Sequence, residues 1–224
     1  GELYAGGAFT TAGGTAASHV AVWNGAVWSA LAGGVDGSVN ALLVSGGGLV
    51  AGGAFTKADG VTANYLAAWD DSAWSAFGSG MNDGVLALAV SGSTLYAGGL
   101  FTTAGGVAAS HIAQWDGTKW SALGSGTNMP VHALAVENGT LYAGGSFTMA
   151  GGAAANRIAK WDGSAWSPLG TGMDDTVLAL ALDNGTLYAG GDFTSAGGVA
   201  DTKFIAQWNG ASWAPLETGM DNSV

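Results

Sequence analysis

The chain alternates short apolar runs with clusters of turn residues, and the same pattern recurs along its whole length. A representative unit begins with the apolar run VLALAV at residues 85–90, followed by the turn residues SGS. An apolar run of this length, bounded by turn residues, is typical of a strand buried on both faces. Three more strands are expected, at residues 95–101, 111–115 and 119–123. The last two flank Asp116-Gly117, which is a strong hairpin turn sequence.

The unit recurs with a nearly constant period. Versions of Leu-Tyr-Ala-Gly-Gly-x-Phe-Thr begin every 46 residues, at Leu3, Leu49, Leu95, Leu141 and Leu187. Four antiparallel strands per 46 residues, without helical periodicity, predict an all-β fold, the five-bladed β-propeller of four-stranded antiparallel blades. We expect one domain over residues 1–224, with blades at about 1–38, 39–84, 85–130, 131–176 and 177–224. A β-solenoid is the alternative, but its coils are usually shorter and lack paired Trp hairpins.

One apolar strand is missing from the count. The first strand of the unit occurs only four times, starting at Val39, Val85, Val131 and Val177. Val224 aligns with the start of a fifth, so one blade is expected to lack its inner strand. Either a segment of a neighbouring chain fills this place or the blade has three strands, and we favour the second. In both cases we expect Gly1 and Val224 to dock closely.

Tryptophans mark the hairpin between the third and fourth strands. The pairs are Trp23/Trp28, Trp69/Trp74, Trp115/Trp120, Trp161/Trp166 and Trp208/Trp213. A Gly-Gly pair, a strand ending in aromatic-Asp-Gly, and a Trp five residues after that aromatic resemble the kelch repeat. Trp replaces the Tyr commoner in the third strand, and a Phe-Thr-x-Ala-Gly-Gly loop is added. The unit is more similar to the LYxGGxFTxAGG…IAxWDGxxWSxLGxG repeats of uncharacterised bacterial surface proteins. Both resemblances imply a propeller fold and strand roles, and neither implies an activity.

Composition narrows the function classes. The net charge is −11 and only 9% of residues are charged, so the basic surface needed to bind nucleic acid or anionic membranes is absent. There is no cysteine, which excludes disulfides and thiolate metal sites. We expect no metal site and no cofactor. The low Lys content and the Gly, Thr, Ser and Trp-rich composition resemble secreted bacterial repeat proteins, which predicts an extracellular or cell-surface location.

The sequence predicts no catalytic residue. Near-identical units supply the same groups several times, whereas catalysis needs different groups in one place. No Ser-His-Asp arrangement, close acid pair or phosphate-binding loop can be assigned. An enzyme domain of the galactose-oxidase kind is a less favoured alternative, because its copper chemistry needs Cys, Tyr and His. We therefore expect that the chain is not an enzyme.

The Trp pairs and an Asx residue recur in every unit, and each has a binding and a structural interpretation. Stacked Trp rings bind sugars in many proteins, but an identical pair in every unit favours packing between adjacent sheets. An Asx residue precedes each inner strand, at Asp36, Asn82, Asn128, Asp174 and Asp221. Such a ring of oxygens at one mouth of a central channel could hold Ca²⁺, although capping of the local turn is favoured because two members are neutral.

Binding residues are expected on one face of the propeller. In a four-stranded meander, the loop between the second and third strands and the linker to the next blade emerge on the same face. These are the long connections here, and loops on a rigid scaffold carry function. The residue at the start of the third strand differs among the units. We therefore expect the ligand to contact His19, Tyr65, His111, Arg157 and Lys203.

These observations predict a non-catalytic interaction or ligand-display module. A glycan or a protein is the expected partner on the long-loop face, with strand donation from a neighbouring chain as a further expected contact. The main alternative is a purely structural or engineered repeat scaffold without a ligand, which the near-identity of the units favours.

Overall fold

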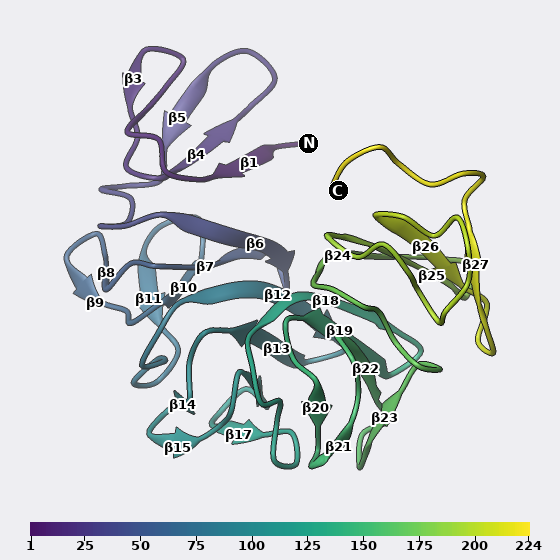
Figure 1. Ribbon diagram of the computed structural model, residues 1–224. Helices are drawn as coiled ribbons and strands as arrows, with labels where there is room; N and C mark the ends of the chain where they lie inside the picture. Colours follow the sequence, from purple (N-terminus) through teal and green to yellow (C-terminus); the bar gives the residue numbers. More distant parts are fainter.

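The computed structural model describes all residues 1–224 and consists of strands joined by turns. We number the units 1 to 5, by residues 1–38, 39–84, 85–130, 131–176 and 177–224. Each unit forms one antiparallel sheet in which successive strands are neighbours. Figure 1 shows the five sheets following one another around a common centre. The structure contains no helix that is long and apolar enough to cross a membrane.

The main strands agree closely with those expected from the hydrophobic pattern. Unit 1 has β1 (Leu3–Gly6), β4 (Val20–Trp23) and β5 (Trp28–Ala30). Unit 2 has β6 (Val39–Ser45), β7 (Gly48–Gly53), β10 (Leu66–Trp69) and β11 (Trp74–Ala76). Unit 3 has β12 (Val85–Ser91), β13 (Thr94–Gly99), β16 (Ile112–Trp115) and β17 (Trp120–Ala122). Unit 4 has β18 (Val131–Glu137), β19 (Thr140–Gly145), β22 (Ile158–Trp161) and β23 (Trp166–Pro168). Unit 5 has β24 (Val177–Asp183), β25 (Thr186–Gly191), β26 (Ile205–Trp208) and β27 (Trp213–Pro215).

The loop between the second and third main strands is more ordered than the sequence predicts. In units 1 to 4 it folds into a small two-stranded hairpin, whose turn is Gly-Gly in units 1, 3 and 4 and Asp59-Gly60 in unit 2. These hairpins are β2 (Thr11–Ala12) with β3 (Thr15–Ala16), β8 (Lys57–Ala58) with β9 (Val61–Thr62), β14 (Thr103–Ala104) with β15 (Val107–Ala108), and β20 (Met149–Ala150) with β21 (Ala153–Ala154). The hairpins and the linkers between units lie at the same end of the sheets, which we call the long-loop face.

Every complete inner strand contains a β-bulge at its second residue. In unit 4, Val131 pairs with Gly145, but the next paired residue is Ala133, opposite Gly144. His132 is therefore the extra residue of the bulge. The same shift occurs in β6, β12 and β24. A bulge leaves one residue unpaired and changes the direction of its side chain.

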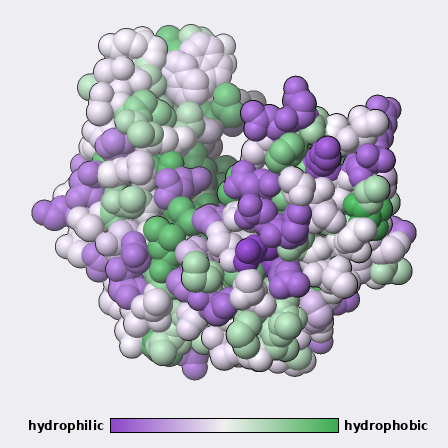
Figure 2. Space-filling model, viewed as in Figure 1, coloured by the Kyte–Doolittle hydropathy of each residue, from purple (hydrophilic) through white to green (hydrophobic).

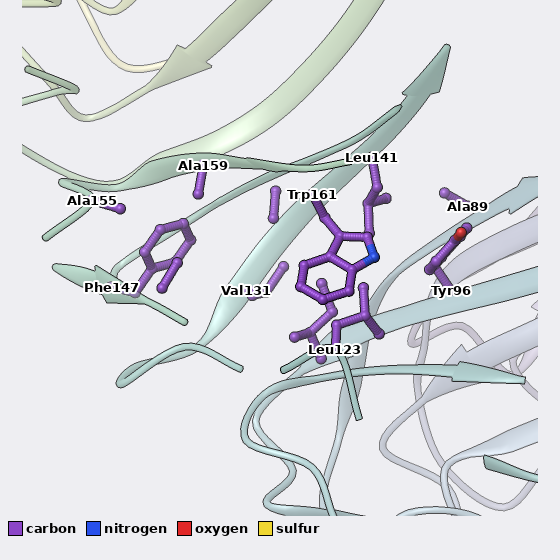
Figure 3. Packing of buried hydrophobic residues seen from close by; sticks show 12 residues of the cluster. Ala89, Tyr96, Leu123, Val131, Leu141, Phe147, Ala155, Ala159 and Trp161 are labelled. Carbon is purple, nitrogen blue, oxygen red and sulfur yellow. The ribbon is translucent and has the colours of Figure 1, made fainter. Parts of the chain in front are cut away.

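The hydrophobic core lies between units rather than within them. The chain has four main clusters of buried residues, and each joins two successive units. Figure 3 shows the cluster between units 3 and 4, where Leu123 of unit 3 packs with Val131 and Trp161 of unit 4. Such nearest-neighbour packing is typical of repeat proteins, in which one unit cannot bury its own apolar faces.

Inner strands of successive units approach each other closely. The inner strands β6, β12, β18 and β24 lie side by side in this order near the centre of Figure 1. At Gly144 of β19, an added Cβ would lie 2.5 Å from Cγ1 of Val177 in the next inner strand. Only glycine allows this approach, which explains the Gly-Gly pair in every unit.

A tryptophan hydrogen bond closes each interface between units. The indole Nε1–H of the second Trp of a hairpin donates to a main-chain oxygen at the end of the preceding unit. The pairs are Trp74 with Leu31, Trp120 with Phe77, Trp166 with Leu123 and Trp213 with Leu169, at 2.8–3.1 Å. Trp28 of unit 1 has no preceding unit and makes no such bond. The packing interpretation of the tryptophans is therefore supported.

Units 1 and 5 differ from the expected closed ring. The sheet of unit 1 has three strands, in the order β1-β4-β5, as favoured from the sequence. No sheet joins units 1 and 5. The chain ends are not in direct contact: no atom lies within 4 Å of the Cβ position of Gly1, whereas Val224 packs on Gly190 of unit 5. The expectation that the two ends dock closely stays a prediction. Figure 1 shows both ends at the gap between units 1 and 5.

Candidate functional site

The bulge position is where the inner strands differ most. Its occupants are Asn40, Leu86, His132 and Leu178, whereas the surrounding pattern Val-x-Ala-Leu-x-(Val/Leu) is retained in all four strands. Because each bulge directly follows a linker, these residues lie at the start of the inner strand on the long-loop face. The units therefore vary at the place where the fold redirects a side chain.

A second variable position lies beside the bulge. It is the residue after Gly-Gly, and its occupants are Ala8, Ala54, Leu100, Ser146 and Asp192. In unit 4 the N–H of Ser146 donates to the main-chain oxygen of Pro130 at 3.0 Å, immediately before the bulged strand begins. Equivalent bonds form in units 2, 3 and 5. Both variable positions of a unit therefore occupy one small area.

Several polar side chains gather in this area in units 4 and 5, whereas unit 2 has only Asn40, whose Nδ2 donates to the main-chain oxygen of Val85 at 3.0 Å. His132 Nε2 and Ser146 Oγ lie 2.8 Å apart, and Arg157 donates from Nη1 to the main-chain oxygen of Ser146 at 2.9 Å. In unit 5, the hydroxyl of Ser223 donates to Asp192 Oδ1 at 2.5 Å. We call His132, Ser146, Arg157 and Asp192 the axial cluster. Figure 2 shows hydrophilic residues gathered right of centre, in the region of β18 and β24, with hydrophobic residues to their left.

The electrostatics of the axial cluster favour a neutral imidazole. Burial lowers the pKa of His132, and the nearby Asp192 carboxylate opposes this effect only in part. His132 is therefore neutral at pH 7, with one ring nitrogen able to donate and the other to accept. The Nε atom of Arg157 is buried without a hydrogen-bond partner. The cluster thus combines neutral and charged donors with a carboxylate acceptor.

This arrangement suits hydrogen bonding better than nucleophilic catalysis. A serine nucleophile needs a histidine base that is itself oriented by a third group. The Ser146–His132 pair has the first contact, but no carboxylate accepts a hydrogen bond from His132. Asp192 instead accepts the hydroxyl of Ser223. The geometry presents a polar surface with alternate donors and acceptors.

The five residues at the start of the third strand share a main-chain conformation and a main-chain hydrogen bond. His19, Tyr65, His111 and Arg157 have φ of 63–66°, and the fifth residue with this conformation is Phe204. Lys203, predicted for this place, lies one residue earlier because unit 5 carries an insertion. Each of the five donates its N–H to the main-chain oxygen of the preceding Phe-Thr phenylalanine at 2.7–2.9 Å.

The five side chains at the start of the third strand are half-buried, and Tyr65 packs against the core cluster between units 2 and 3. Burial lowers the pKa of His111, and hydrogen bonding of the protonated ring to the main chain of Gly99 and Leu100 opposes this effect. Nδ1 of His19 and of His111 is buried without a partner. Of the predicted binding set, the structure brings only Arg157 together with other variable polar residues.

The Asx residues form an inter-unit clamp rather than a local cap. Oδ1 of Asp174 accepts the N–H groups of Thr194 and Ser195 at 2.9 Å, and its Oδ2 accepts the hydroxyl of Thr194. Asp36, Asn82 and Asn128 make the corresponding bonds about 20 residues ahead. Asp221 makes none of them. The structure contains no group of three or more His, Asp or Glu side chains placed to hold a metal ion.

Burial and hydrogen bonding shift the pKa of the two clamp carboxylates in opposite directions. Burial raises the pKa of Asp174, but the hydrogen bonds from Thr194 and Ser195 outweigh it, so the pKa lies below its ordinary value. Asp36 behaves in the same way through Thr56 and Lys57. Both carboxylates are therefore ionised at neutral pH and hold the next unit in place.

Sequence reasoning missed His132, Ser146 and Asp192 as a group. The pattern did contain a signal, because the second residue of each inner strand changes from Asn to Leu to His to Leu within a retained pattern. A regular strand would alternate its side chains, however, and the bulge that redirects this residue is not visible in the sequence. The pairing of two variable positions also depends on the sheet register.

No family model matches the chain, and no curated protein matches its sequence. Among solved structures, it is similar to the computationally designed Ika8 protein, with a TM-score of 0.58 and 18% identity, over 92% of this chain and 57% of that one. The WD40 β-propeller domain of Doa1 matches with a TM-score of 0.52 and 16% identity, over 81% of this chain and 55% of that one. The extracellular domain of the hybrid two-component system BT4673 from B. thetaiotaomicron matches with a TM-score of 0.61 and 12% identity, over 92% and 26%. These likenesses show an all-β, propeller-like repeat fold.

Proposed function

We propose that the chain is a non-catalytic β-propeller module, with its five units as blades, that binds a ligand on the long-loop face at the axial cluster. The single observation that supports this proposal is a difference in residues between equivalent positions of the units. Within strands whose surrounding pattern is retained, unit 3 carries Leu86 and Leu100 at two adjacent positions, whereas units 4 and 5 carry His132, Ser146 and Asp192 there. A purely structural role would not need polar residues there, since Leu86 and Leu100 fill the same positions in unit 3.

The chemistry of the cluster favours a ligand rich in hydroxyl groups. A neutral His132, the Ser146 hydroxyl and the Asp192 carboxylate offer donors and acceptors within a small area, with the Arg157 guanidinium beside them. Sugar hydroxyls donate and accept hydrogen bonds at once, so a glycan is the first candidate and a polar protein loop the second. An extracellular or cell-surface location agrees with this choice, and BT4673 is one structurally similar protein whose matched part is extracellular.

The experiment uses the repeat as its own control. Replacing His132 and Ser146 together by Leu installs in unit 4 the pair that unit 3 already carries, Leu86 and Leu100, so the fold should tolerate it. We expect glycan-array binding by the wild-type protein and its loss in this double variant. The reverse double variant, Leu86→His with Leu100→Ser, should retain the original binding.

Two experimental outcomes would distinguish a ligand-binding protein from a structural scaffold without a ligand. Binding that persists unchanged in the His132→Leu, Ser146→Leu variant would contradict the axial cluster as the site. Absence of binding to both glycans and extracellular proteins would favour the alternative function, a structural or engineered scaffold without a ligand. That alternative is supported by the near-identity of the units and by the likeness to a designed protein.

A further inference from the structure

The edge of β1 is exposed in a way that no equivalent strand shares. Leu3 is 58% exposed, whereas its counterparts Leu49 and Leu141 are 1% and 0% exposed. In units 2 to 5 the inner strand covers this edge through six paired positions, but β1 has only β4 beside it. A free strand edge presents unpaired N–H and C=O groups that can accept another strand.

The free main-chain groups of β1 can be assigned. The N–H of Gly7 donates to the main-chain oxygen of His19, which lies on the β4 side. Groups of successive residues in a strand point to opposite sides. The main-chain N–H and C=O of Tyr4 and Gly6 therefore point away from β4, toward the exposed edge.

A second exposed surface borders the same gap. On β24, Leu178 is 40% exposed and Ala179 is exposed, whereas the equivalents of Ala179 in β12 and β18, Ala87 and Ala133, are each 7% exposed. Those two residues are covered by the inner strand of the next unit. Figure 1 shows β24 and β1 on the two sides of the gap, and Figure 2 shows a notch in the surface there. An added strand would cover both surfaces.

Val224 gives the direction of such a strand. It packs on Gly190 as Val177 packs on Gly144, with Cγ1 at 2.9 Å and 2.5 Å from the respective Cβ positions. It thus occupies the place of the first residue of an inner strand. A strand that begins at this place would run antiparallel to β1, from Gly7 toward Glu2, as β18 does beside β19.

We propose that β1 is a strand-acceptor edge, which binds an extended apolar segment of a partner protein by adding it to the sheet of unit 1. The β18–β19 register fixes the sequence class of this segment. Val224 already holds the first position, so the segment begins at the bulge position, and the register then places Ala opposite Gly6, Leu opposite Ala5, Ala opposite Tyr4 and Val opposite Leu3. The next position lies opposite Glu2, so Lys or Arg there complements the carboxylate that already accepts the Tyr4 hydroxyl at 2.8 Å. This proposal is independent of ligand binding at the axial cluster.

The test uses a labelled peptide with the sequence His-Ala-Leu-Ala-Val of residues 132–136, followed by three Lys residues, and a scrambled peptide of the same composition. We expect saturable binding by fluorescence anisotropy for the first peptide only. Hydrogen exchange of the Tyr4 and Gly6 amides should slow on binding, since these are the groups that gain partners. No saturable binding, or binding without this protection, would overturn the proposal.

Two variants at one position isolate the main-chain contact. Tyr4→Pro removes an N–H that faces the free edge without removing a β1–β4 bond, and Pro is accepted at such edge positions. Tyr4→Ala removes the same side chain but keeps the N–H. We expect Tyr4→Pro to weaken peptide binding about tenfold relative to Tyr4→Ala, as expected for one lost main-chain hydrogen bond. Equal affinities of the two variants would contradict strand addition.

The oligomeric state of the free protein is a further test of the proposed partner. If it is a dimer whose Tyr4 and Gly6 amides are already protected, and Tyr4→Pro makes it monomeric, a second copy covers the edge. That outcome overturns the proposal in favour of self-association. A monomer with fast-exchanging Tyr4 and Gly6 amides is the expected state.

Discussion

The interface between units 3 and 4 and the outward side of unit 1 are built from the same motif but differ in burial. Leu141 and Leu3 occupy the same repeat position, yet one is fully buried and the other is 58% exposed. Trp166 donates its indole N–H to Leu123, while Trp28 has no acceptor. In a repeat protein the identity of a residue thus does not decide its burial. The surroundings decide it: unit 1 lacks an inner strand beside β1 and also a preceding unit, and adjacent units cover each other's apolar faces in a repeat protein.

The largest expected effect comes from a buried tryptophan. Trp161 is 8% exposed and packs against Gly124 of unit 3, whereas Trp23 of unit 1 is half-buried and has no preceding unit. Trp161→Ala should lower the free energy of unfolding by about 3–5 kcal/mol, as a large-to-small core change. Trp23→Ala should cost about 1–2 kcal/mol, because less apolar area is removed from contact. Denaturant unfolding of both variants gives the two values.

The difference between these two costs is the informative quantity. Equal losses would mean that packing within a unit, rather than between units, stabilises the tryptophans. An unchanged midpoint for Trp161→Ala would show that this ring is free to bind a ligand, contrary to the packing interpretation.

A smaller effect is expected for the Asx clamp. Asp174 accepts three hydrogen bonds from the next unit's loop, whereas Asp221 accepts none of them. Because the clamp is exposed to water, Asp174→Ala should cost only about 1–2 kcal/mol. Asp221→Ala should leave the thermal midpoint within error of the wild type. A matching loss in both variants would show that charge, rather than the inter-unit bonds, is responsible.

The smallest effect is expected from pH. The folded-state pKa values of Asp36 and Asp174 lie below the ordinary value, so their stabilisation is complete above about pH 4 and is lost as the pH falls through the folded pKa. The clamps of Asn82 and Asn128 do not titrate. Below pH 4, the amides of Thr56 and Thr194 should therefore exchange their hydrogens faster than those of Thr102 and Thr148, after correction for intrinsic rates.

A substitution sharpens this pH comparison. Asp36→Asn should keep the Thr56 clamp, as Asn82 does for Thr102, and should remove the acid sensitivity of the Thr56 amide. If Thr56 remains acid-sensitive in this variant, another titrating group controls the interface between units 1 and 2.

The sequence by itself determined the all-β repeat, the four strands of a unit and the unit that lacks one. These features are local: the run at residues 85–90, the Asp116-Gly117 turn and the Trp pairs each fix a strand or a hairpin through neighbouring residues. The three-stranded sheet of unit 1 follows from the same count.

Only the tertiary structure decided how these strands meet. The bulge at His132, its contact with Ser146 and the partner of Asp174 about 20 residues ahead all depend on strand register and on the packing of one unit against the next. The insertion before Phe204 could not be placed without its main-chain bonds. The absence of a sheet joining units 1 and 5 likewise depends on how successive sheets pack. That packing includes contacts such as Val177 on Gly144, between residues far apart in the chain, so the sequence carries no local record of it.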